Sequence, residues 1–145
     1  MTVAFRNVRS GPTDPVSSWP TEAVQAALER GGLAEWRRLA EEVRAHPWGR
    51  TARQIEEVLS HSRPYGTAEL LERTVEAARA RAEGEERAAV AAELRELVSR
   101  SGLVQAEFAR RLGTSASRLS SYVNGAVVPS ATLMVRARRI IHSER

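Results

Sequence analysis

The chain of 145 residues lacks cysteine and lysine altogether. The absence of cysteine excludes disulfide bonds and metal sites built on thiolates. No stretch approaches the roughly 20 consecutive apolar residues of a membrane-spanning helix, and the N-terminus carries no apolar signal segment. We therefore expect a cytoplasmic protein with no membrane partner.

Signals of catalysis are also missing. His46, His61 and His142 are isolated in the sequence, and none has the spacing of a metal site with another histidine. There is no glycine-rich phosphate loop, and the serine-rich segment 115–121 lacks the Gly-x-Ser-x-Gly setting of a catalytic serine. We expect a protein that is not an enzyme and uses no metal or cofactor.

Positive charge is distributed unevenly along the chain, whose formal net charge is +4. Residues 1–84 contain 12 Arg and 12 acidic residues, whereas residues 85–145 contain 10 Arg and 6 Glu. The whole excess therefore lies in the C-terminal part. A local excess of positive charge is typical of a domain that meets a polyanion, although many other domains carry as much.

Helix-length segments separated by glycine and proline predict an all-α fold, and no segment has the alternating pattern of a strand. Three of the six prolines fall within the first 20 residues, so we expect residues 1–19 to form a flexible arm. Helices are predicted next over 21–30, over 33–45 and from Thr51 onward, with Thr21 and Thr51 as N-caps.

A longer helical segment begins near Thr67 and reaches Ser101, with Gly84 near its middle. Glycine costs about 1 kcal/mol relative to alanine inside a helix, which permits a kink there. We expect a helical unit of unknown role over 20–84 and a second domain over 85–145, joined by this long helix. The tryptophans of the N-terminal part either fill its core or form an aromatic patch for a partner: Trp19, Trp36 and Trp48.

The segment 105–125, QAEFARRLGTSASRLSSYVNG, has the pattern of a helix, a tight turn and a second helix. Phe108 and Leu112 are four residues apart and therefore share one helical face. Gly113 can adopt a positive φ and end the first helix, and Ser115 can cap the second. This spacing presents one helix to the major groove of DNA.

The second helix of this motif is apolar on one side and small and polar on the other. Leu119 and Tyr122 are three residues apart and face inward, and Asn124-Gly125 supplies a C-terminal stop. The opposite face is almost free of charge, as a helix needs to be to touch base edges in a groove: Ala116, Ser117, Ser120, Ser121 and Asn124.

Together these residues resemble the helix-turn-helix of the Cro/phage-repressor class, also called XRE-type regulators. The resemblance extends over residues 88–142, because LRELVSRSGL before the motif and Pro129-Ser130 with ATLMVRARRI after it match the neighbouring helices of that family. It implies a four-helix DNA-binding domain within residues 85–145.

Two departures from the family pattern carry expectations. Val98 and Val123 stand where family members often have an internal ion pair, so we expect these two valines to touch. The fifth helix often found in the family is missing, so we expect the N-terminal unit or a second copy of the chain to cover that surface.

The resemblance implies further contacts with DNA, most of them with its backbone, for four residues. Gln105 would bond a phosphate or serve only as a capping residue, and Ser115 would bond a phosphate as well as cap its helix. Arg118 would bond either guanine or a phosphate. Asn124 would bond the backbone or act only as a C-cap.

The positions that usually touch base edges are occupied by Ala116, Ser117 and Ser121. A serine hydroxyl can donate or accept and therefore distinguishes bases loosely, and alanine can contact only a thymine methyl group. We expect either modest specificity, dependence on DNA shape, or help from flanking arginines. Arg6 and Arg9 in the N-terminal arm either reach a minor groove or carry incidental charge.

The implied function is sequence-specific binding of double-stranded DNA by a transcriptional regulator, a repressor that inserts helix 115–124 into the major groove. Such proteins commonly bind as homodimers, because two half-sites multiply specificity. The alternative is an antitoxin-type protein whose N-terminal unit binds a partner protein and whose helix-turn-helix represses its own operon. A phage-derived repressor is a third hypothesis.

Overall fold

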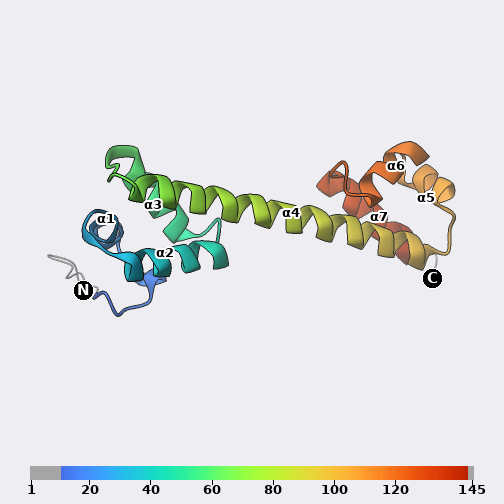
Figure 1. The fold of residues 1–145 in the computed structure, drawn as a ribbon. Coiled ribbons are helices and arrows are strands. Elements are labelled where there is room, and N and C mark those ends of the chain that lie inside the picture. Colours follow the sequence, from blue (N-terminus) through green and yellow to red (C-terminus); the bar gives the residue numbers. More distant parts are fainter. Residues whose placement is uncertain (1–10, 144–145) are drawn as a thin grey trace. The chain divides into compact units, whose positions relative to one another are not determined.

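A computed structural model describes residues 11–143, and every regular element in that range is helical (Figure 1). The all-α prediction is confirmed. The elements are η1 (Val16–Ser18), α1 (Thr21–Arg30), α2 (Leu33–Ala45), α3 (Arg50–His61), α4 (Thr67–Ser101), α5 (Gln105–Leu112), α6 (Ala116–Val123) and α7 (Ala131–Ser143). In the described range no helix is both long enough and apolar enough to cross a membrane.

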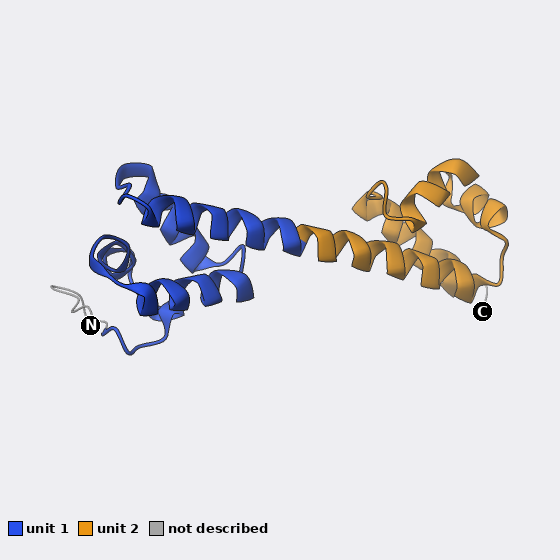
Figure 2. Cartoon of the chain, viewed as in Figure 1, with its two compact units in different colours: residues 1–82 blue, residues 83–145 orange. Residues whose placement is uncertain are grey.

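The chain divides into two compact units, the first ending at Ala82 and the second beginning at Glu83 (Figure 2). Each unit has an apolar core of its own, and α4 contributes residues to both cores. The border lies beside Gly84, which occurs within α4 without ending the helix. Arg6 and Arg9, whose contact with a minor groove was one expectation, lie outside the described residues.

The core of unit 1 is formed by η1, α1, α2, α3 and the first turns of α4. Each of these elements buries one side, as the amphipathic spacing of its apolar residues requires. The start of α2 is fixed by the buried Glu35 carboxylate, which accepts the Gly32 N–H at 2.9 Å. The main core side chains are Val16, Trp19, Val24, Leu28, Leu39, Val43, Ile55, Val58, Leu59, Leu71 and Val75.

Residues 11–19, which the sequence analysis expected to belong to a flexible arm, pack onto unit 1. Trp19 is fully buried, and its indole N–H donates to the Asp14 carbonyl at 3.1 Å. The Arg38 guanidinium donates to the carbonyls of Pro12 and Asp14 and lies 4.9 Å from the centre of the Trp19 ring. Proline content suggested mobility, but burial of a large indole offsets the entropy lost by ordering this segment.

The three tryptophans have different environments. Trp19 fills the core, whereas Trp36 packs against it with partial exposure. Trp48 is 50% exposed, and the Arg79 guanidinium lies 4.8 Å from the centre of its ring. The core interpretation is therefore confirmed for Trp19, and the other two side chains keep accessible surface.

Two predicted N-caps are wrong. Thr21 is the first residue of α1, which begins after Pro20. Thr51 is the second residue of α3, which begins after Gly49. Both threonines carry a hydroxyl group and follow a turn, which is why the local pattern suggested capping. In the fold Thr51 is buried instead, because α3 presents this position to the core.

Unit 2 is a four-helix domain built from the C-terminal part of α4 with α5, α6 and α7. Phe108 and Leu112 of α5 are fully buried, and so is Leu119 of α6. These three side chains pack with apolar residues of α4 and α7 in one cluster: Leu94, Leu97, Ala109, Val123, Met134, Ala137, Ile140 and Ile141. The two short helices are thus held by a shared core rather than by their own length.

Replacing the buried Trp19 by alanine is expected to lower the free energy of unfolding of unit 1 by about 3–5 kcal/mol, because a large cavity is left in the core. Trp48→Ala, on a half-exposed side chain, is the matched control and should cost less than about 1 kcal/mol. All three tryptophans lie in unit 1, so urea unfolding followed by tryptophan fluorescence reports this unit alone. Equal effects of the two substitutions would contradict the packing of residues 11–19.

Candidate nucleic-acid interface

A short turn fixes the position of α6 after α5. Gly113 ends α5 with φ of 83°, a left-handed conformation that favours glycine. The Gly113 N–H donates to the Arg110 carbonyl at 3.1 Å, and the Thr114 N–H donates to the Ala109 carbonyl at 3.0 Å. These two bonds satisfy carbonyls that the end of a helix leaves without partners. The predicted glycine stop is confirmed.

The first turn of α6 is closed by Ser115, whose backbone is extended and whose hydroxyl oxygen accepts the Arg118 N–H at 3.1 Å. The predicted N-cap is therefore confirmed. At the other end, Asn124 is the C-cap and Gly125 has φ of 75°. The helix between them is only eight residues long, so its caps contribute a large part of its stability.

The burial pattern of α6 separates an inner face from an outer face. Leu119 and Val123 are buried in the core of unit 2. Ser117 and Ser121 lie about 400° apart around the helix, on nearly the same side, because each residue turns by about 100°. Ser117 is exposed and Ser121 is partly exposed. The outward face is thus small and polar.

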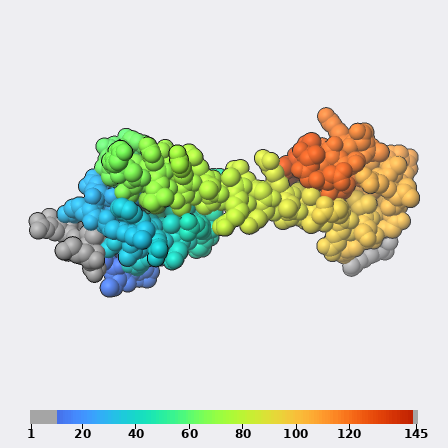
Figure 3. All heavy atoms as spheres, in the orientation of Figure 1, coloured from blue at the N-terminus to red at the C-terminus, as the bar shows by residue number. Residues whose placement is uncertain are grey.

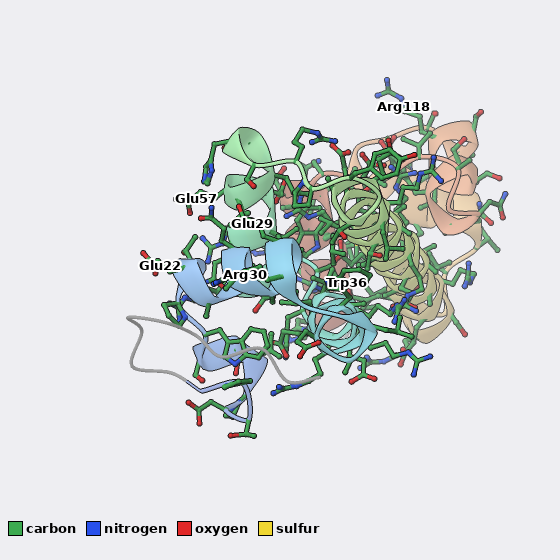
Figure 4. The ribbon with its side chains drawn as sticks, turned by 60° about the vertical axis from the view of Figure 1, so that its left-hand side comes forward. Glu22, Glu29, Arg30, Trp36, Glu57 and Arg118 are labelled. Carbon is green, nitrogen blue, oxygen red and sulfur yellow. The ribbon has the colours of Figure 1, made fainter. Side chains whose placement is uncertain are left out.

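Hydroxyl and amide groups on this outer face keep capacity for an external partner. The Ser121 hydroxyl donates to the Ser117 carbonyl at 3.3 Å, which leaves its oxygen able to accept. The Asn124 amide donates to the Ser120 hydroxyl at 3.4 Å. Arg118 is exposed and its side chain extends away from the protein surface (Figure 4). Within residues 11–143 its guanidinium has no carboxylate partner.

The structure brings the predicted site residues together on one domain. Six of them belong to α6 or its two caps: Ser115, Ala116, Ser117, Arg118, Ser121 and Asn124. The seventh, Gln105, is exposed and is the first residue of α5. Their contact with DNA stays a prediction, which the placement permits because none of the seven is buried.

Two arginines that the sequence analysis did not identify hold the motif helices at their C-terminal ends. Arg136 of α7 donates to the Leu112 carbonyl, the last of α5, at 2.9 Å. Arg95 of α4 donates to the Val123 carbonyl, the last of α6, at 2.5 Å. A cation at a helix C-terminus also opposes the negative end of the helix dipole. The partners are 24 and 28 residues apart in sequence, so no local pattern could have revealed them.

The expected contact between Val98 and Val123 is partly addressed by the fold. Val123 belongs to the core of unit 2, and Val98 is a partly buried side chain packed against the same core. Their direct contact stays a prediction. The charged link between these helices comes instead from Arg95, about one helical turn before Val98, and it reaches backbone rather than a carboxylate.

Charges around the motif are largely paired within the domain. Hydrogen bonds from Arg110 and then Arg111 hold the pKa of Glu107 below its usual range, at donor–acceptor distances of 2.7 and 3.2 Å. A 2.7 Å hydrogen bond from Arg138 likewise lowers the pKa of Glu93 and links α7 to α4. These pairs neutralise arginines of α5 and α7, so the positive charge of α6 is carried by Arg118.

Among the residues that the structure describes, no three histidine, aspartate or glutamate side chains are grouped as a metal site would require.

The comparison with protein families gives a match over this domain. A family described as a helix-turn-helix domain matches residues 89–141, just over a third of the chain. The match includes the end of α4, the whole of α5 and α6, and most of α7, and it is consistent with the resemblance to XRE-type regulators. Comparisons with curated proteins and with solved structures give no match.

Ser115→Ala is expected to lower the free energy of unfolding of unit 2 by about 1 kcal/mol, because the Arg118 N–H loses its acceptor. Ser117→Ala is the matched control: its hydroxyl caps nothing, and alanine favours helix by up to about 0.5 kcal/mol. Circular dichroism during urea unfolding follows both units, while tryptophan fluorescence follows unit 1 alone. A Ser115→Ala protein that unfolds like the wild type would refute the capping role.

Proposed function

We propose that this chain, whose C-terminal part is a helix-turn-helix domain, is a sequence-specific DNA-binding regulator of transcription that inserts α6 into the major groove. The observation that carries the proposal is the outward face of α6. It is small, polar and exposed, it has one arginine at its margin, and both of its ends are fixed by caps. A helix with these properties can approach base edges without burying an unpaired charge.

Some side chains of α6 would contact base edges, and others would contact the DNA backbone. Ser117 and Ser121 would donate to or accept from base edges, and Ala116 would meet a thymine methyl group. Arg118 lies beside this face, where it would reach a phosphate or a guanine. Because serine hydroxyls discriminate weakly between bases, part of the specificity would come from DNA shape.

The remaining predicted residues would position the domain on the duplex. Gln105 and Ser115 lie at the N-termini of α5 and α6, where helix dipoles favour phosphate oxygens. Asn124 would bond the backbone at the other end of α6. Such contacts fix register and carry no sequence information themselves.

The regulator would act as a repressor by occupying its operator, and it would do so as a homodimer. One eight-residue helix with three small side chains at the base-reading positions offers few specific bonds. Two copies on an inverted repeat would each discriminate between base sequences, and the two contributions would add. The dimer would fix the spacing of the half-sites at about one helical turn of DNA or a multiple of it. The proposal assigns no catalytic step to the chain.

The antitoxin hypothesis is the second candidate. It requires a protein-binding surface in the N-terminal part, and unit 1 has its own core together with accessible apolar side chains. In that case DNA binding would serve to repress the operon that encodes both partners.

The direct test is selection of bound sequences from a library of random duplex DNA at near-physiological salt. We expect enrichment of an inverted repeat, whose centre-to-centre spacing reports the geometry of the dimer. Binding without an enriched sequence, or no binding, would overturn the proposal and favour the protein-partner hypothesis.

Arg118→Ala is expected to weaken binding to the selected site. The dependence of the loss on salt and on base sequence shows whether Arg118 contacts a phosphate or guanine. If Arg118 meets a phosphate, affinity falls for all sequences and the slope of log K against log salt becomes shallower by about 1. If it meets guanine, discrimination at one base pair falls by about 1–3 kcal/mol. Arg30→Ala, which removes the same charge from exposed Arg30 of unit 1, is the control and should change neither quantity.

A further inference from the structure

Unit 1 has a surface groove between α2 and the first turns of α4, with a volume of about 380 Å³. The two helices run in the same direction (Figure 1), and their surfaces are neighbours in unit 1 (Figure 3). A second hollow of about 310 Å³ continues it along α4 and shares Arg44, Leu70 and Thr74 with the first. The groove is therefore elongated rather than a closed cavity.

The floor of the groove is apolar and accessible. Leu33 and Leu70, one from each helix, are 58% and 49% exposed. The partly buried Trp36 (labelled in Figure 4) also lines the groove, and so does Ala40, about one turn later on α2. The Trp36 indole N–H is already bonded to the Ala27 carbonyl at 3.0 Å, so the ring is held in place and offers only apolar surface. Fixed tryptophans of this kind are frequent anchors in protein interfaces.

The rim of the groove is positively charged. Arg37 and Arg44 come from α2 and Arg73 comes from α4, against a single lining carboxylate, Glu41. Within residues 11–143 these three guanidinium groups have no carboxylate partner. An apolar floor beside unpaired cations fits a partner that is apolar on one side and acidic at its margins.

The groove on the other side of α4 provides a contrast. It lies between α3 and α4, and both of its arginines are paired inside the unit: Arg63 bonds Glu72 at 2.9 Å, and Arg79 bonds Glu56 at 2.5 Å. A partner there would have to break existing ion pairs. The α2–α4 groove carries no such penalty for its three arginines.

We propose that the α2–α4 groove binds an acidic amphipathic α-helix of a partner protein. The lining of α2 runs from Leu33 to Arg44, which spans about 16 Å or three helical turns. A helix of that length would place apolar residues at i, i+3, i+4 and i+7 on Leu33, Trp36 and Leu70, with Asp and Glu facing the arginines. Nucleic acid would satisfy the arginines but would leave the apolar floor without a partner. This inference does not depend on DNA binding by unit 2.

The test uses the full chain and a fluorescent peptide of about 14 residues, crosslinked to hold a helix because so short a helix is marginal alone. The peptide carries leucines at i, i+3, i+4 and i+7 and glutamates at the flanking positions. A second peptide has lysine in place of each glutamate. Fluorescence anisotropy should show that the acidic peptide binds at least about tenfold more tightly than the basic one.

Variants of the groove locate the binding. Leu70→Ala should weaken binding of the acidic peptide about tenfold, whereas Val104→Ala, on an exposed valine of unit 2, should not change it. Both side chains are exposed, so neither change should unfold the protein. The Arg44→Glu/Arg73→Glu double variant should bind the basic peptide more tightly than the acidic one. Arg53→Glu changes an exposed arginine outside the groove and should keep the preference for the acidic peptide.

Five results would overturn the proposal, and four of them come from the peptide assays. The first three are no binding of the acidic peptide at about 1 mM, equal binding of both peptides, and an unchanged affinity in the Leu70→Ala protein. The fourth is that random-sequence duplex DNA displaces the peptide, and does so equally well from the wild type and from the Gln105→Ala protein, because the groove itself would then bind DNA. Loss of a dimer on Leu70→Ala substitution would assign the groove to a second copy of the chain and would also overturn it.

Discussion

The turn between α5 and α6 is the constraint on which the candidate interface depends. The left-handed backbone of Gly113 ends one helix, and the Ser115 hydroxyl begins the next two residues later. A shift of one residue in this turn would rotate α6 by about 100°, and Leu119 would leave the core while a serine entered it. The same geometry that lets the two helices share a core therefore decides which side chains face outward. Because α6 has only eight residues, its rotation depends on this turn together with the Leu119 and Val123 side chains that it buries.

Packing around that turn is reinforced from elements distant in sequence. Arg136 and Arg95 bond the last carbonyls of α5 and α6, and each does so from a helix that also supplies core residues. The arginine-rich composition thus serves two purposes in unit 2. Some guanidinium groups close helix ends or pair with Glu107 and Glu93, and Arg118 is left to face solvent. A count of net charge would not have separated these roles.

Unit 1 is stabilised by a larger core that leaves an apolar groove exposed. Its helices bury one side each around Trp19, and the prolines of residues 11–19 do not prevent that segment from packing, because proline fixes the backbone without opposing burial of its neighbours. Its helices leave Leu33 and Leu70 exposed in the α2–α4 groove, whereas the arginines of the α3–α4 groove are paired with carboxylates. The two units therefore present different chemistry: hydroxyl groups and one arginine on α6, and apolar surface with arginines between α2 and α4.

The sequence by itself determined the helices and the motif, since both depend on local spacing. The limits of α1, α2 and α4, the stop at Gly113 and the cap at Ser115 all follow from residues within a few positions of one another. Only the tertiary structure decided the burial of Trp19, the carbonyl contacts of Arg95 and Arg136, and the pairing of some arginines but not others. Those outcomes depend on side chains 24 or more residues apart, or on which face a neighbouring helix covers, and no local pattern encodes either.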